Sequence, residues 1–71
     1  MSDSNTISVL INQVPHLLPA QATLEDAIRH FGIKPPFAAA VNLKFIPKGI
    51  YASCTLHPND EIELIAPITG G

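Results

Sequence analysis

Residues 7–11 are rich in β-branched residues, with apolar side chains at every second position, and they predict a β-strand. The inward face of that strand consists of Ile7, Val9 and Ile11. Residues 14–18 predict a second strand, and Asn12-Gln13 between the two predicts a turn, so the strands form a hairpin. Pro15 has no N–H to donate to a neighbouring strand, and it therefore places the second strand at an edge of the sheet.

A helical spacing follows in residues 24–31. Thr23 is a favourable N-cap residue, and Asp26 three positions later completes a variant of the capping box. Apolar residues at intervals of three and four form one stripe, which we expect to pack as core against the sheet: Leu24, Ala27, Ile28 and Phe31. Gly32 suits the left-handed residue after a helix, and Pro35-Pro36 prevents the helix from continuing.

Several short segments follow the helix. Residues 37–42, apolar up to Val41, predict a third strand buried behind the helix, and residues 43–46 predict a further short strand. Residues 49–54 are irregular, with one helical turn. After a turn at 57–60, alternation returns in 61–65 and predicts the last strand. Its inward positions are Ile62 and Leu64.

The order of these elements predicts one α+β domain. A helix laid over one face of a mixed sheet is the two-layer solution for a hairpin, a helix, short strands and a final strand. We divide the 71 residues into a flexible N-terminus (1–6), the domain (7–66) and a flexible C-terminal tail (67–71). We expect the last strand to insert beside the first, so that the tail projects into solvent.

Composition narrows the functional classes. The formal net charge is −2 and the four basic residues are scattered, unlike the basic surface of a nucleic-acid-binding protein. No apolar run approaches the length of a membrane span, and the first residues do not resemble a signal peptide. A single cysteine, Cys54, allows no intrachain disulfide and is typical of a reducing compartment. We therefore expect a cytoplasmic protein that binds neither nucleic acid nor membrane.

Side chains that catalyse reactions are few and dispersed. The three histidines lie in separate segments, at His16, His30 and His57. Cys54 has no histidine or asparagine in a recognisable catalytic arrangement, and it fits better as a small apolar filler. No cluster of Cys and His has the spacing of a zinc site, and there is no glycine-rich phosphate loop. We therefore predict no metal, no bound cofactor and no enzyme acting alone.

The last two residues, Gly70 and Gly71, remain as candidates for chemistry. Glycine has no Cβ, so two glycines can pass through a narrow channel and leave the terminal carbonyl carbon open to a nucleophile. Fully extended, the tail spans at most ~16–18 Å, which is enough to reach a buried site in a partner. We therefore predict the Gly71 carboxylate as the reacting group. The residues expected to thread the partner's active site are Pro67, Ile68, Thr69 and Gly70.

Four motifs, in their order and at this chain length, resemble the ThiS branch of the ThiS/MoaD sulfur carriers. They are Ala39-Ala40-Val41-Asn42, Ile46-Pro47-Lys48, Asp60-Glu61-Ile62-Glu63-Leu64 and Gly70-Gly71. The likeness covers residues 7–71 and implies a ubiquitin-like β-grasp fold. Two features depart from the family pattern. The usual Asp-Gly-Asp turn reads Pro58-Asn59-Asp60, and the first hairpin lacks its common glycine.

The resemblance also implies a mechanism for thiamine biosynthesis. An E1-like activating enzyme would use ATP to adenylate the Gly71 carboxylate. A persulfide from a sulfur donor, such as a cysteine desulfurase, would then replace AMP, and the resulting thiocarboxylate would give its sulfur to a thiazole synthase. The carrier would be a co-substrate. Two alternatives stay open: the small subunit of molybdopterin synthase, and an unmodified ubiquitin-like binding module whose terminal glycines are incidental.

Alternation within the strands also predicts an exposed apolar patch. If the inward positions of the first strand face the helix, Leu10 faces away, and the same argument turns Ile65 outward in the last strand. Because these two strands are expected to be neighbours, we predict that Leu10 and Ile65 lie together near the root of the tail. They would form a partner-binding surface.

Overall fold

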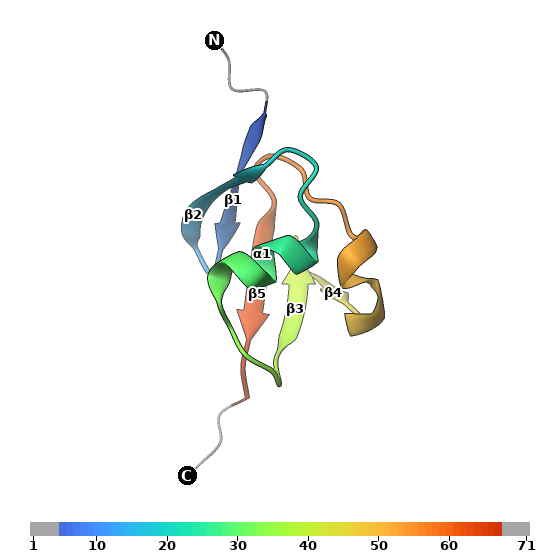
Figure 1. Cartoon of the computed structure of the whole chain (residues 1–71). Helices are drawn as coiled ribbons and strands as arrows, with labels where there is room; N and C mark the ends of the chain where they lie inside the picture. The colour runs from blue at the N-terminus through green and yellow to red at the C-terminus, as the bar shows by residue number, and fades with distance from the viewer. Residues whose placement is uncertain (1–4, 68–71) are drawn as a thin grey trace.

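The computed structural model describes residues 5–67, which form a five-stranded sheet with a helix across one face (Figure 1). In chain order the elements are β1 (Thr6–Ile11), β2 (Val14–Pro19), α1 (Leu24–Phe31), β3 (Ala38–Val41), β4 (Lys44–Ile46), the 3₁₀ helix η1 (Lys48–Ser53) and β5 (Glu61–Ile65). The strand order is β2-β1-β5-β3-β4. The final strand therefore inserts into the middle of the sheet.

The sheet is mixed because β5 runs parallel to β1 and antiparallel to β3. Both hairpins, β1-β2 and β3-β4, are antiparallel. The predicted α+β arrangement is confirmed, including the placement of the last strand beside the first. The face of the sheet opposite α1 is called the open face below.

Both hairpins turn through two residues with positive φ. Asn12 and Gln13 have φ angles of 52° and 73°, and Asn42 and Leu43 have 52° and 70°. Such angles suit the two-residue turns whose twist matches that of the strands. Leu43, predicted as the start of a strand, instead lies in the second turn and is 86% exposed. Pro15 lies in β2 at the sheet edge, as predicted.

The core lies between α1 and the sheet. Its residues alternate along the strands and are joined by Ala22 and by Leu56 from the loop before β5: Ile7, Val9, Ile11, Leu18, Ala22, Leu24, Ala27, Ala39, Leu56, Ile62 and Leu64. Every predicted inward position of the first and last strands is among them. Leu24 and Ala27 on the helix are fully buried.

The far end of the helix stripe is not core, and the prediction for Phe31 is wrong. Phe31 is 36% exposed, and its ring lies 6.2 Å from the ring of His16 on β2. The reason is that α1 ends over the edge strand, where no further strand covers the side chain. Ile28, one turn earlier, is partly buried against the core.

The helix begins and ends where its cap residues predict. The Thr23 hydroxyl accepts a hydrogen bond from the Asp26 N–H, and the Asp26 carboxylate accepts one from the Thr23 N–H at 2.9 Å. This backbone N–H lowers the pKa of Asp26 below its usual value. Gly32 follows with φ 87°. Within residues 5–67, no helix is long and apolar enough to cross a membrane.

The ordered sheet extends further towards the N-terminus than predicted. Thr6 pairs with Pro19, and the Asn5 carbonyl accepts a hydrogen bond of 2.9 Å from the Ala20 N–H. Both residues belong to the segment that the sequence predicts as flexible. The hairpin therefore begins at residue 5 or 6 rather than at residue 7.

Candidate functional site

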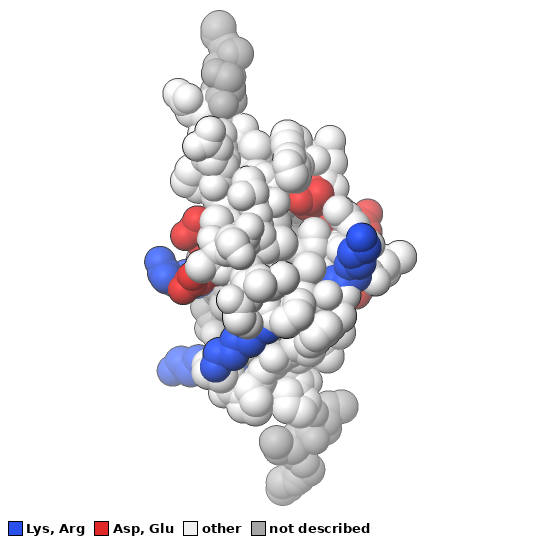
Figure 2. Space-filling view, turned by 90° about the vertical axis from the view of Figure 1, so that its right-hand side faces the viewer, with Lys and Arg blue, Asp and Glu red and all other residues white. Residues whose placement is uncertain are grey.

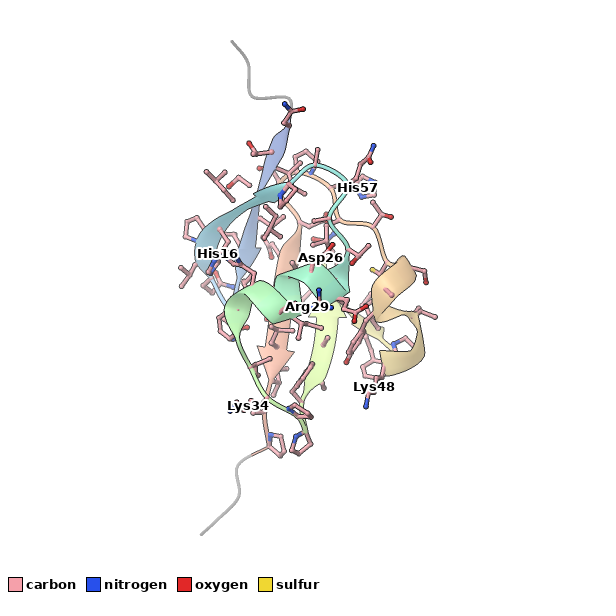
Figure 3. The ribbon with its side chains drawn as sticks, in the orientation of Figure 1. His16, Asp26, Arg29, Lys34, Lys48 and His57 are labelled. Carbon is pink, nitrogen blue, oxygen red and sulfur yellow. The ribbon has the colours of Figure 1, made fainter. Side chains whose placement is uncertain are left out.

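Two of the three histidines meet, although the sequence places them in separate segments. The rings of His16 on β2 and His30 on α1 are perpendicular, with centroids 5.1 Å apart. The Nε2 atom of His16 is buried without a hydrogen-bond partner among the described residues. His57 lies apart from them, beside Asp60 (Figure 3). No group of three or more potential metal ligands occurs within residues 5–67.

Cys54 is half-buried and packs against the core. Burial raises the pKa of its thiol, and the nearby Asp60 carboxylate adds to the effect. A thiol with a raised pKa forms little of the reactive thiolate at neutral pH. Its environment therefore agrees with the predicted role as a filler.

A hollow of about 440 Å³ lies on the helix side of the molecule, between α1, the loop after it and η1. It is lined mainly by apolar residues, with the Phe37 and Tyr51 rings stacked at a centroid distance of 6.1 Å. Glu25 and Lys48 contribute its charged groups, and Glu25 is already paired with Arg29 at 3.3 Å. On the side drawn in Figure 2, charged side chains are scattered over a largely uncharged surface.

The C-terminal tail begins at the end of β5, the strand held between two others. Ile65 is 58% exposed, and Ala66 and Pro67 are also exposed. Pro67 is the only predicted tail residue that the structure describes. Ile68, Thr69, Gly70 and Gly71 lie outside the described residues. The described part of the site is therefore the root of the tail and the surface around it.

Asparagine side chains hold β5 near both of its ends. Asn12 accepts a hydrogen bond of 2.8 Å from the Leu64 N–H, and its amide nitrogen donates one of 3.2 Å to the Leu64 carbonyl. Asn42 accepts one of 3.0 Å from the Glu61 N–H and donates to the Asp60 carboxylate at 3.0 Å. From the sequence, Asn12 is predicted only as a turn residue. The sequence feature common to both contacts is an asparagine at the first position of each hairpin turn.

The predicted patch of Leu10 and Ile65 does not form. Both residues belong to the open face, but Leu10 lies opposite Glu61, four positions before Ile65 along β5. At about 3.3 Å per residue, the register separates them by ~13 Å. Alternation gives the face of each residue correctly, whereas the stagger between β1 and β5 decides their separation.

Other apolar residues lie on the open face, at the root of the tail and two strands away from it. Ala38 on β3 lies opposite Ile65, and a shallow hollow joins both to Pro67. Phe45 on β4 belongs to the same open face, opposite Ala40, and is 68% exposed. Phe45 is not among the site residues predicted from the sequence. Side chains alternate between the two faces along residues 44–46. Because Ile46 packs against the core, its neighbour Phe45 must lie on the open face.

Comparisons with known proteins agree with the fold. The family model described as the ThiS family matches residues 4–71. Among solved structures, the fold is similar to the crystal structure of the thiamine biosynthesis protein (ThiS) from Geobacter metallireducens, with a TM-score of 0.76 and 12% sequence identity. That match covers 92% of this chain and 100% of that chain. The predicted β-grasp fold is confirmed. No curated protein matches the chain.

Proposed function

The chain belongs to the ThiS family, and from this premise we propose that it is a sulfur carrier of thiamine biosynthesis. The observation that carries the proposal is that the family match extends over residues 4–71 and so includes Gly70-Gly71. This match favours the thiazole branch over the small subunit of molybdopterin synthase. The reacting group of the proposed carrier is the carboxylate of Gly71.

The proposed chemistry requires an activated carboxylate. The Gly71 carboxylate attacks the α-phosphate of ATP on an E1-like activating enzyme, pyrophosphate leaves, and an acyl adenylate forms. The terminal sulfur of a donor persulfide then attacks the carbonyl carbon, and AMP leaves with the electron pair of the broken C–O bond. A thiol reduces the resulting acyl disulfide and releases the thiocarboxylate. A thiazole synthase receives this sulfur.

The carrier contributes the reacting carboxylate and a recognition surface, and its partners contribute the catalysis. Support for this division comes from the described residues, in which two histidines pair with each other, His57 lies beside Asp60, and the pKa of the single cysteine is raised. A tail that begins at an exposed proline and ends in two glycines can reach a partner's active site, because glycine has no Cβ to obstruct a channel. ATP belongs to the activating enzyme.

The intact mass of the protein tests the proposal directly. In protein purified from cells starved for thiamine, we expect a fraction whose mass is higher by the difference between sulfur and oxygen. Fragmentation should place the change at Gly71. Protein from cells supplied with thiamine serves as the control. A mass that is unmodified under both conditions would favour a binding module without sulfur chemistry.

We further propose that the open face around the tail root contacts the activating enzyme, with Phe45 and Ile65 as its exposed apolar anchors. Buried aromatic anchors carry much of the binding energy of protein interfaces. Leu10 is less exposed than Phe45 and Ile65, which makes it a peripheral part of such a surface.

Phe45→Glu should raise the KM of the carrier in the adenylation reaction by about tenfold, as expected for loss of an interface anchor. Because Phe45 is 68% exposed, the melting temperature should change little. Leu43→Glu is the matched control, since Leu43 is 86% exposed but lies in the β3-β4 turn. Both variants add the same charge. Equal effects of the two on KM would exclude this surface.

A further inference from the structure

The parallel pairing of β1 with β5 continues beyond the point where the β1 backbone turns away. The Asn12 N–H still donates to the Ile62 carbonyl at 2.9 Å, but its φ of 52° takes the following peptide into the hairpin turn. The carboxamide of Asn12 then occupies the place of the next peptide group. Its oxygen accepts from the Leu64 N–H at 2.8 Å and its nitrogen donates to the Leu64 carbonyl at 3.2 Å.

These two bonds decide whether the end of β5 is held from one side or from both. The backbone groups of a strand point alternately to its two neighbours. Those of Glu63 and Ile65 face β3, where the partners are Ala40 and Ala38, so those of Leu64 face the β1 side. Beyond Ile62, β1 supplies no further strand residue on that side. The hydrogen bonds between Asn12 and Leu64 are therefore the last attachment of β5 on the β1 side. Leu64 lies three residues before Pro67.

We propose that Asn12 is a positioning residue for the reaction of the tail. By fixing both backbone groups of Leu64, it sets the direction in which the residues after Ile65 leave the sheet. The Gly71 carboxylate is thereby presented to the activating enzyme. This inference rests on the proposed sulfur-carrier function. When only a fraction of a protein has the binding-competent orientation, its apparent affinity falls by that fraction.

Asparagine meets two requirements at this position. It tolerates a positive φ better than most residues, and its carboxamide carries one donor and one acceptor side by side, like a peptide group. Glycine tolerates the same φ but has no carboxamide. The substitution Asn12→Gly therefore removes the two bonds to Leu64 without straining the turn.

The second hairpin provides a matched control. Asn42 has the same φ of 52° and also binds β5 through its carboxamide, but at Glu61 and Asp60, where the strand begins. Asn42→Gly therefore loosens β5 at the end away from the tail. A general loss of rigidity would affect both variants alike, whereas loss of tail positioning would affect only Asn12→Gly.

The experiment measures amide hydrogen exchange and adenylation of the full chain by the E1-like activating enzyme of the same organism. Exchange should accelerate at the Leu64 N–H in Asn12→Gly and at the Glu61 N–H in Asn42→Gly. Asn12→Gly should raise the KM of the carrier by about tenfold with kcat unchanged, because loss of two hydrogen bonds leaves a minority of tails correctly directed. Asn42→Gly should keep the wild-type KM.

Each other outcome has a defined meaning. Equal KM values for the two variants, whether raised or unchanged, would overturn the positioning role of Asn12 and leave the carrier function intact. A wild-type chain that the enzyme does not adenylate would overturn the carrier function itself, and the positioning role with it. If Asn12→Gly does not fold, Asn12→Asp keeps the shape and the acceptor but places a carboxylate oxygen against the Leu64 carbonyl in place of the donor. It should also raise KM, and a wild-type KM would overturn the role.

Discussion

Deletion of Gly71 should abolish thiocarboxylate formation and leave the domain folded. The proposed chemistry takes place at the carboxylate of this residue, and without it the new terminal carboxylate stops one residue short of the activated phosphate. A shift of one residue is about 3.3–3.6 Å in an extended chain, far more than an in-line attack tolerates. Among the described residues the last core residue is Leu64, so we expect the melting temperature to equal that of the full chain. Intact mass after incubation with activating enzyme, ATP and sulfur donor measures the first effect, and far-UV circular dichroism measures the second.

Addition of one residue tests the same requirement from the other side. A residue appended after Gly71 should block sulfur transfer, whereas one added before Met1 lengthens the chain equally and should have no effect. Gly70→Val should also impair activation with the fold retained, because a β-branched side chain restricts the backbone and crowds a channel. Sulfur transfer by a chain that lacks Gly71 would contradict the proposed function.

The structure confirms the elements that can be predicted from residues close together in the sequence. Thr23, Asp26 and Gly32 fix the ends of α1 through contacts within a few residues, so the sequence predicts the helix well. Period-two alternation gives the inward faces of β1 and β5 for the same reason. Exposure at Phe31 depends on whether a further strand lies beneath the end of the helix, and no local pattern carries that information.

The candidate site likewise has one feature that can be predicted from local sequence and others that depend on the whole sheet. Gly71 can be proposed from the sequence because the proposed chemistry needs only a terminal carboxylate and a family resemblance. The stagger of β1 against β5, which separates Leu10 from Ile65, depends on the whole sheet. The bonds of Asn12 to Leu64 join residues 52 positions apart, so the sequence shows the turn at Asn12 but not its second role.

The stability of the domain should depend on Leu24 far more than on Phe31, although both belong to one helix stripe. Leu24 is fully buried, and Leu24→Ala should lower the free energy of unfolding by roughly 2–5 kcal/mol, through lost burial and the cavity left behind. Phe31 is 36% exposed at the sheet edge. Phe31→Ala should cost about 1–2 kcal/mol, since part of its surface is in water already and alanine favours the helix.

Urea unfolding followed by far-UV circular dichroism measures both values and suits a chain without tryptophan. A domain of 71 residues is stabilised by about 4–10 kcal/mol, so Leu24→Ala should remove a large part of the total. At roughly 4–8 °C per kcal/mol, its melting temperature should also fall well below that of Phe31→Ala. Ala27→Gly would serve poorly as a control, because glycine also weakens the helix itself. A larger loss for Phe31→Ala than for Leu24→Ala would contradict the packing of α1 described above, since it would require Phe31 to carry core contacts that an exposed ring at the sheet edge does not make.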